Sequence, residues 1–198
     1  MLTPRAVSVL EELEKWGEEN DRVQTERSRK MLNLDRGTAE LMRALIAGRQ
    51  PRRILEIGTS NGYSTIWLAA SLTASSQNAG RVFTIDRNPE KHRLARENLE
   101  RAGLAASVEF LTGDATELVA KIDGPLDVVF FDGDRFTAPA QLASLVPKLA
   151  PSALILADNA LSHPNEIAGY LAAIAELPDF EHTIVPVGKG LSVAHRTE

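Results

Sequence analysis

The chain has 198 residues, of which 43% are hydrophobic and 25% charged, a composition typical of globular proteins and not of disordered chains. Its net charge of -5 leaves no basic surplus, so we expect no nucleic-acid partner. The absence of cysteine excludes disulfides, thiolate metal sites and a cysteine nucleophile. No apolar stretch approaches the roughly 20 residues of a membrane span, and the N-terminus lacks a secretory apolar segment. We therefore expect a cytoplasmic protein without a membrane partner.

The first quarter of the chain is predicted to be helical, over residues 4–50. Val9, Leu13 and Trp16 recur at helical spacing, and a second apolar stripe follows before a glycine and a proline stop it. Between the two stripes, residues 21–29 are strongly polar, which favours an exposed helix or a loop. The sequence thus predicts a helical segment ahead of the rest of the chain.

From residue 53 onward, short apolar runs alternate with helix-compatible stretches. Strands are predicted at Ile54–Ile57, Val82–Ile85, Val108–Leu111, Val128–Phe131 and Leu154–Leu156. Helices are predicted at Tyr63–Ala74, Pro89–Ala102, Ala115–Lys121, Ala138–Leu149 and Asn165–Leu177. This alternation is typical of βαβ units in a parallel sheet, and the continuous hydrophobicity of the strands indicates that both sheet faces are covered.

Two final apolar runs, His182–Val187 and Leu191–His195, are separated by the short link Gly188–Gly190. A link of this length predicts a hairpin and not a crossover, so the last two strands should be antiparallel. The predicted fold class is therefore α/β, with a mostly parallel seven-stranded sheet, helices on both faces and an antiparallel C-terminal hairpin.

The first predicted strand ends in a glycine turn that is typical of a ligand-binding loop. Gly58 and Gly62 stand four residues apart, between the strand and a predicted helix. Ser60 stands where a dinucleotide G-x-G-x-x-G motif needs its second glycine, and the lysine of a P-loop is absent. A nucleotide-type ligand is the favoured interpretation. The alternative is a tight turn whose glycines serve packing alone.

The second predicted strand ends at Asp86. An acidic residue at this place commonly accepts hydrogen bonds from a ribose diol. Alternatively, Asp86 belongs to the N-cap region of the following helix. The glycine turn and Asp86 together favour a nucleotide-type ligand more strongly than either feature alone.

The ordered motifs resemble the class I S-adenosylmethionine-dependent O-methyltransferases, which have a Rossmann-like fold. EIGTSNGYST, FFDGD, ADNA and VPVGKGLSVAH stand in the order found in the cation-dependent catechol and caffeoyl-CoA type, and the resemblance extends from about Met31 to His195. It implies S-adenosylmethionine as cofactor. The cofactor-binding residues implied in this way are Glu56, Gly58, Thr59, Ser64, Asp86, Arg87, Asp114, Ala115 and Asp132.

The resemblance also implies what part of the cofactor each residue contacts. Glu56 and Gly58 would lie against its methionine end and adenosine, and Ser64 would bind its carboxylate. Asp86 would bind the ribose hydroxyls, and Asp114–Ala115 would lie at the adenine edge.

A metal site is predicted where the fourth and fifth strands end. Asp132, Asp158 and Asn159 offer two carboxylates and one amide oxygen at neighbouring carboxyl ends of the sheet. This set suits Mg²⁺ first, and also Mn²⁺ or Ca²⁺, more than zinc. In the related enzymes such an ion chelates vicinal hydroxyls of the acceptor, and Asp132 would stand between cofactor and metal. The alternative is that Asp158 and Asn159 merely turn the chain.

Asp132 and Arg135 are the predicted catalytic residues. Arg135 occupies the position of a lysine that the related enzymes commonly carry three residues after this aspartate. Arginine stays protonated in proteins, so it cannot act as a general base. Either the metal alone drives ionisation of the acceptor or another group takes the proton, with His163 and Lys189 as candidates. Arg135 could instead anchor an anionic acceptor.

The predicted function is methyl transfer from S-adenosylmethionine to a hydroxyl of a small, catechol-like aromatic acceptor, assisted by a divalent cation. The alternatives are a metal-independent methyltransferase acting on another small-molecule nucleophile, a non-catalytic cofactor-binding protein, and a nicotinamide-binding module, which the missing glycine argues against. The residues interpreted as structural are His92, His182, His195, Trp16 and Trp67.

We expect a single methyltransferase domain over residues 1–198. Residues 51–198 would form the cofactor-binding core and residues 1–50 a helical cap. The resemblance implies that the cap covers the acceptor site or supports a homodimer.

Overall fold

The computed structural model describes residues 2–72 and 80–197 of the chain. Its helices are α1 (Pro4–Val23), α2 (Arg36–Ala47), α3 (Tyr63–Ala69), α4 (Pro89–Ala102), α5 (Ala115–Lys121), α6 (Ala138–Leu145) and α7 (Pro164–Ala175). Its strands are β1 (Arg53–Ile57), β2 (Arg81–Asp86), β3 (Val108–Thr112), β4 (Leu126–Phe131), β5 (Leu149–Ala157), β6 (Phe180–Val185) and β7 (Leu191–Arg196). None of the helices within these ranges combines the length and the apolar character needed to cross a membrane.

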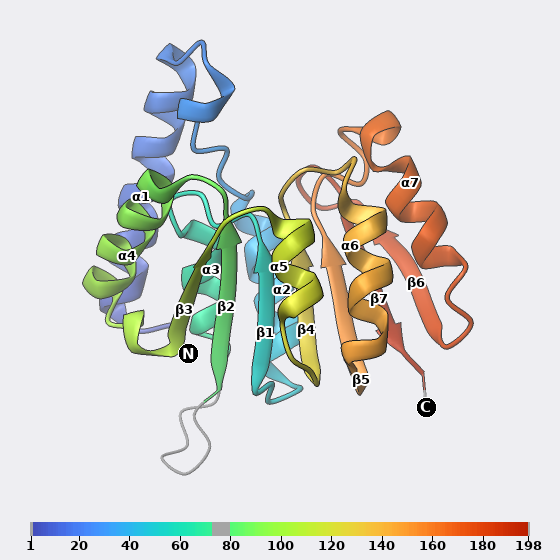
Figure 1. Cartoon of the computed structure of the whole chain (residues 1–198). Helices are drawn as coiled ribbons and strands as arrows, with labels where there is room; N and C mark the ends of the chain where they lie inside the picture. The colour runs from blue at the N-terminus through green and yellow to red at the C-terminus, as the bar shows by residue number, and fades with distance from the viewer. Residues whose placement is uncertain (1, 73–79, 198) are drawn as a thin grey trace.

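The strands form one sheet in the order β3-β2-β1-β4-β5-β7-β6 (Figure 1). Strands β1 to β5 are parallel to one another, and β7 is antiparallel to both β5 and β6. The strand order reverses at β1, which pairs with β2 on one side and β4 on the other, and ligands bind such sheets beside this point. The predicted parallel sheet with an antiparallel C-terminal hairpin is confirmed.

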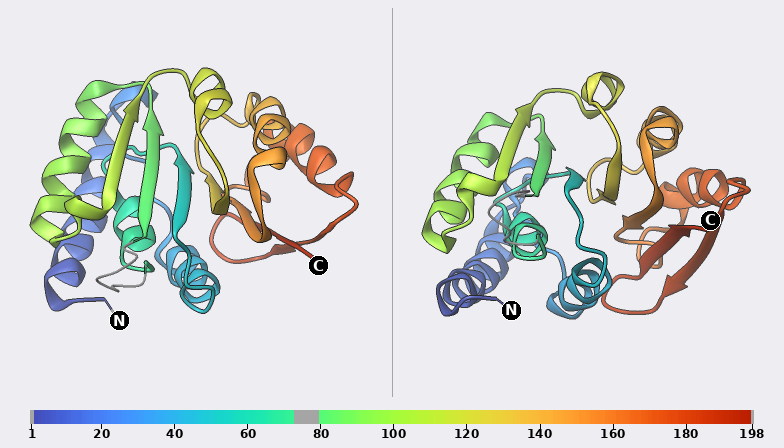
Figure 2. Two further views of the ribbon diagram at one scale, coloured as in Figure 1. Left: turned by 60° about the horizontal axis from the view of Figure 1, so that its bottom comes forward. Right: turned by 90° about the horizontal axis from the view of Figure 1, so that it is seen from below.

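Helices cover both faces of the sheet, as Figures 1 and 2 show, with α5, α6 and α7 on one face and α1 to α4 on the other. Successive strand residues point to opposite faces and feed two cores. Ile54 and Val82 pack with α1 to α4, whereas Leu55 and Phe83 pack with the helices of the other face. Burial on both faces explains why the central strands are continuously apolar.

The predicted helical segment over residues 4–50 is interrupted in the structure. Residues 24–35, which lie between α1 and α2, are mostly extended with one short 3-10 turn. The carboxylate of Asp21 accepts hydrogen bonds from the backbone N–H groups of Met31 (2.7 Å) and Leu32 (2.8 Å). These contacts join residues far apart in the sequence, so helical periodicity alone does not predict them.

The two tryptophans differ in burial. Trp67 is 2% exposed and packs in the core beneath α1 and α2, as expected of a structural residue. Trp16 is 40% exposed, so its predicted place in the buried stripe of α1 is wrong. The buried face of α1 passes through Val9, Leu10 and Leu13 instead.

Some predicted helix ends are also wrong. Helix α3 ends at Ala69, and its predicted end at Ala74 lies outside the described residues. Helix α6 ends at Leu145 and not at Leu149, because Leu149 already pairs with Leu126 as the first residue of β5. Strand β5 begins at Leu149 and not at the predicted Leu154. The other strands and helices predicted after residue 50 are present with small shifts at their ends.

Candidate active site

A cavity of about 700 Å³ opens at the carboxyl ends of β1, β2 and β4. Its volume lies within the range of roughly 300–1,000 Å³ that is usual for small-molecule sites. Residues from the glycine turn, from the ends of the strands and from the segment between α1 and α2 line it, among them Met31, Gly58, Thr59, Ser64, Asp86, Arg87, Asp132, Arg135, Asn159, His163 and Lys189. The cavity thus brings together most of the site residues predicted from the sequence.

The glycine turn presses against its neighbours so closely that both glycines are needed. Gly58 has a φ of 109°, and a Cβ there would lie 2.5 Å from the backbone oxygen of Asp132. Gly62 has a φ of 86°, and a Cβ there would lie 3.0 Å from Ala95 of α4. Backbone conformation and packing therefore both require glycine. The turn also lines the cavity, so packing is not its only role.

Glu56 is fully buried on β1, below the residues that line the cavity. Its carboxylate accepts hydrogen bonds from the hydroxyls of Ser64 (2.5 Å), Thr65 (2.5 Å) and Thr84 (2.6 Å). Burial raises the pKa of Glu56 to about 7, although the three hydroxyls oppose this shift. Since Ser64 lines the cavity, Glu56 is connected to it through that hydroxyl.

Asp86 lies at the end of β2 and lines the cavity next to Arg87. Its carboxylate accepts hydrogen bonds from the backbone N–H groups of Ser60 (3.0 Å) and Asn88 (2.9 Å). Asn88 is the N-cap of α4, because its side chain accepts from the N–H of Glu90. The alternative interpretation of Asp86 as a capping residue is therefore not needed, and its carboxylate stabilises the glycine turn from the cavity side.

The predicted adenine-edge residues line a smaller cavity of about 100 Å³ beside the main one. Asp114 and Ala115 lie there together with Asp86. The carboxylate of Asp114 caps α5 by accepting from the backbone N–H groups of Thr116 (2.8 Å) and Glu117 (3.2 Å). The structure thus places the predicted adenine and ribose residues next to each other.

The N-terminal segment is bound to the glycine turn by hydrogen bonds. The Ser60 hydroxyl donates to the backbone oxygen of Met31 (2.7 Å), and the ammonium group of Lys91 donates to the backbone oxygen of Lys30 and to the Ser60 hydroxyl (3.2 Å). Lys91 is only 8% exposed, and this burial lowers its pKa. The segment therefore forms part of the cavity wall.

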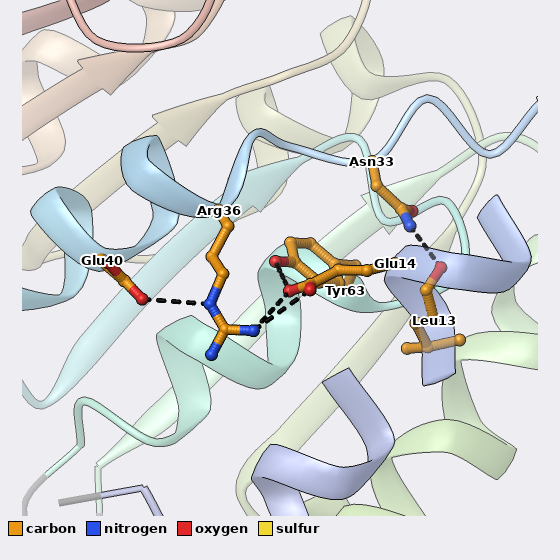
Figure 3. A network of polar contacts seen from close by, with 6 residues as sticks. All are labelled: Leu13, Glu14, Asn33, Arg36, Glu40 and Tyr63. Atoms are coloured by element: carbon orange, nitrogen blue, oxygen red, sulfur yellow. Dashed lines mark hydrogen bonds and ion pairs between the residues drawn. The ribbon is translucent and has the colours of Figure 1, made fainter. Parts of the chain in front are cut away.

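A second network connects α1, α2 and α3 behind the cavity (Figure 3). The Tyr63 hydroxyl donates to Glu14 (2.6 Å), which also pairs with Arg36 (3.1 Å). The side-chain amide of Asn33 donates to the backbone oxygen of Leu13 (2.8 Å). Burial, and then the hydrogen bond to Glu14, raise the pKa of Tyr63. These contacts hold the N-terminal helices against the first turn of α3.

Asp132 and Asp158 are neighbours at the carboxyl ends of β4 and β5. They directly follow the paired residues Phe131 and Ala157. Burial raises the pKa of both carboxyl groups, and the negative charge of Asp158 raises that of Asp132 further. Asp158 is 4% exposed, and its Oδ1 atom has no hydrogen-bond partner among the described residues. The buried Asp158 carboxylate with its free oxygen, beside the half-buried carboxylate of Asp132, fits a divalent cation of the Mg²⁺ type.

Asn159 adds the amide oxygen of the predicted metal set, with a φ of 69° that asparagine tolerates. Its Oδ1 atom accepts a hydrogen bond from Nη2 of Arg135 (2.5 Å). Nη1 of the same guanidinium donates to Glu166 of α7 (2.9 Å). No three acidic or histidine side chains gather as ligands in residues 2–72 and 80–197, so the predicted site rests on two carboxylates and this amide.

The two candidate proton acceptors also line the cavity. His163 is the N-cap residue of α7, and its Nδ1 atom hydrogen bonds with the Ser162 hydroxyl (2.8 Å). Lys189 lies in the link between β6 and β7, and its backbone oxygen accepts from the N–H groups of Leu161 and Ser162. The link of the hairpin thus contributes Lys189 to the cavity wall.

Sequence analysis missed the part that His92 plays behind the glycine turn. This buried imidazole hydrogen bonds with Thr59 (3.0 Å) and Thr112 (2.7 Å), and Thr59 hydrogen bonds with Thr84 (2.6 Å). Thr84 in turn donates to Glu56, so a continuous chain of hydrogen bonds extends from buried Glu56 on β1 to the exposed Thr112 at the end of β3. Its members come from four separate elements, and no local motif signals it.

The strand order, the glycine turn and the cavity define a Rossmann-like fold of the class I methyltransferase type. An O-methyltransferase from Bacillus cereus, solved in complex with S-adenosylhomocysteine, matches with a TM-score of 0.81 and 27% identity, covering 96% of this chain and 91% of that chain. An O-methyltransferase involved in tomaymycin synthesis in Streptomyces achromogenes, solved in complex with S-adenosylmethionine, matches with a TM-score of 0.79 and 26% identity, covering 99% and 91%.

Residues 55–160 match a family model described as a methyltransferase domain, and the chain belongs to this family. A catechol O-methyltransferase from Mycobacterium tuberculosis is 41% identical over 119 residues, which are 59% of this chain and 52% of that protein. The chain spans about half the length of the catechol O-methyltransferases it matches. The resemblance to class I O-methyltransferases is confirmed.

Proposed function

We propose that the protein transfers a methyl group from S-adenosylmethionine to a hydroxyl oxygen of a small, catechol-like aromatic acceptor. The observation that carries this proposal is that the glycine turn, Asp86 and Asp132 line one cavity, with Asp158 next to Asp132 at the end of β5. It joins a nucleotide-type site to a site for a hard cation. The relatives, which include catechol O-methyltransferases, support the reaction and the acceptor class.

We further propose that a divalent cation, Mg²⁺ in the first place, assists the reaction. Asp132, Asp158 and Asn159 would hold it through oxygen atoms. Such an ion lowers the pKa of a bound hydroxyl and orients it for reaction. The unpartnered Oδ1 atom of Asp158 supports the assignment, because a buried carboxylate oxygen without a partner is costly.

The protein's own residues would position the two reactants. Ser64 would bind the carboxylate of the cofactor, Asp86 its ribose, and Asp114–Ala115 its adenine edge. Arg135 stays charged and pairs with Glu166, so it acts as a positioning group. The acceptor proton leaves to His163 or Lys189, and the pH dependence of His163→Gln and Lys189→Met variants distinguishes the two.

Residues 1–50 would form the cap of one methyltransferase domain over residues 1–198, and residues 51–198 its core. Part of this cap, which includes Met31, lines the cavity. Phe136 is 72% exposed and also lines the cavity, where it offers a ring for an aromatic acceptor. A homodimer that completes this opening stays a prediction, and analytical ultracentrifugation tests it.

Methyl transfer to a panel of catechols, flavonoids and hydroxycinnamates, with Mg²⁺ present, tests the function. We expect turnover of at least one acceptor and its loss on addition of a chelator. Asp158→Ala should lower kcat at least about 100-fold, since changes even around metal ligands cost 10- to 100-fold. Glu18→Ala is the control, because this carboxylate is exposed on α1 and lies outside the cavity.

A metal-independent methyltransferase is the second candidate. The hydrogen bond from Arg135 to Asn159 favours it, because it already engages one oxygen of the metal set. Turnover that survives the chelator and the Asp158→Ala substitution would establish this candidate. Absence of both turnover and S-adenosylhomocysteine binding would refute both.

A further inference from the structure

Arg135 lies where its guanidinium can interfere with a cation. It follows β4 by a short loop, and its side chain is only 12% exposed. One arm of the guanidinium bonds Oδ1 of Asn159 (2.5 Å), and the other bonds Glu166 (2.9 Å). The planar fork therefore bridges the end of β5 and the first turn of α7. Oδ1 of Asn159 is the same oxygen that the metal set needs.

Positively charged side chains near this bridge already compensate the two carboxylates that a divalent cation would bind. Arg135 lines a small cavity together with Asp132 and Asp158, and Lys189 lines the main cavity together with Asp132. Two resident cations thus already compensate the carboxylate pair. A divalent cation that enters the site meets repulsion from both of them.

We infer that Arg135 is a built-in competitor of the divalent cation: it holds the Asn159 oxygen when the cation is absent, and the cation binds only as Arg135 retreats toward Glu166. This inference rests on the proposed function, whose metal set it uses. Glu166 makes the retreat feasible, because its partly exposed carboxylate can receive both arms of the guanidinium. The affinity of the protein for the cation therefore depends on Arg135 as well as on the residues that bind the cation.

The alternative to competition is a purely structural role for Arg135. If Arg135 merely oriented Asn159 for metal binding, its removal would weaken cation binding. Competition predicts that its removal strengthens binding. The direction of the change in affinity therefore separates the two roles, and no measurement of turnover is needed.

The test is titration of the full-length protein with Mn²⁺, followed by electron paramagnetic resonance of the free ion. Arg135→Met keeps an apolar stem and removes the charge, and it should bind Mn²⁺ about 10-fold or more tightly than the unmodified chain, since a hydrogen bond to a charged group is lost. Arg135→Lys, which keeps the charge but cannot bridge two partners, should fall between the two. If the methionine variant folds poorly, the lysine variant alone still shows whether Mn²⁺ binding becomes tighter.

Two further variants sharpen the test. Glu166→Gln removes the retreat position, so it should weaken Mn²⁺ binding. Arg49→Met, which removes an exposed arginine outside the cavity, is the matched charge control and should leave Mn²⁺ affinity unchanged. Equal or weaker binding in both Arg135 variants would overturn the inference.

S-adenosylhomocysteine binding, measured by calorimetry on each variant, separates failure of the inference from failure of the proposed function. Absence of Mn²⁺ binding in every variant would overturn both the competition and the cation, with cofactor binding still intact. Absence of S-adenosylhomocysteine binding would refute the methyltransferase function, whatever the Mn²⁺ affinities are.

Discussion

At the scale of single residues, the site combines buried charges that no local pattern predicts. The sequence placed Glu56 within the first strand and Asp86 and Asp132 at strand ends, because short apolar runs followed by acidic residues are recognisable. It did not predict that Glu56 lies under three hydroxyls or that Arg135 bonds Asn159, since these partners come from other elements. Side-chain partners depend on tertiary packing, and one sequence does not encode them locally.

Glu56 should make stability depend on pH. Its pKa is raised from 4.5 to about 7 by burial, so the folded state holds a proton that the unfolded chain loses between these pH values. The contribution is complete below about pH 4.5 and is lost as the pH rises through about 7. Between pH 5 and 8, unfolding free energy should fall by about 2 kcal/mol more than in Glu56→Gln.

Urea unfolding of both proteins across this pH range measures the difference. Glu18→Gln, which alters an exposed carboxylate on α1, is the control and should follow the unmodified chain. Parallel pH profiles for the unmodified chain and Glu56→Gln would contradict the prediction.

At the scale of elements, the strands and the helices after β1 could be predicted, because burial on both faces leaves continuous apolar runs between glycine and proline stops. For the break between α1 and α2, the polar residues 21–29 left an exposed helix and a loop as alternatives, and the sequence did not decide between them. The break depends on Asp21 binding the backbone at Met31 and Leu32, and that contact exists only once α1 is packed. Helix ends were predicted less well where one element passes directly into the next, as α6 does into β5.

The hydrogen bond between Tyr63 of α3 and Glu14 of α1, drawn in Figure 3, should contribute to the free energy of unfolding. Tyr63→Phe removes the hydrogen bond to Glu14 and leaves Glu14 paired with Arg36, so it should cost about 1 kcal/mol of stability. Glu40→Gln breaks only an exposed ion pair with Arg36 and should change stability by less than about 0.5 kcal/mol. Chemical unfolding measures both, and equal effects would show that the Tyr63 hydroxyl contributes nothing.

At the scale of the whole molecule, charge is distributed unevenly. The chain carries a net charge of -5, yet basic residues outnumber acidic ones around the cavity. The basic residues there are Arg27, Lys30, Arg87, Lys91, Arg135 and Lys189, and the acidic ones are Asp86, Asp132, Asp134 and Glu166. The cavity therefore favours ligands with a negative group, which agrees with the carboxylate of the proposed cofactor.

Because the cavity lies between the N-terminal segment and the sheet, a ligand there should stabilise the molecule as a whole. S-adenosylhomocysteine at 100 times its Kd should add about 2.7 kcal/mol and raise Tm by roughly 5–10 °C for a chain of this size. Scanning calorimetry measures the shift. NAD at the same concentration is the control, since the glycine turn lacks the dinucleotide motif, and an equal shift with NAD would refute the assignment of the cofactor.

Phe136 stands exposed at the wall of the cavity, in a chain without any cysteine. A cysteine introduced there would be the sole thiol of the molecule, so an environment-sensitive dye would attach at that place alone. Its fluorescence would follow the arrival of an acceptor in real time. The exposed ring thus marks a position from which ligand entry can be observed without an assay of product.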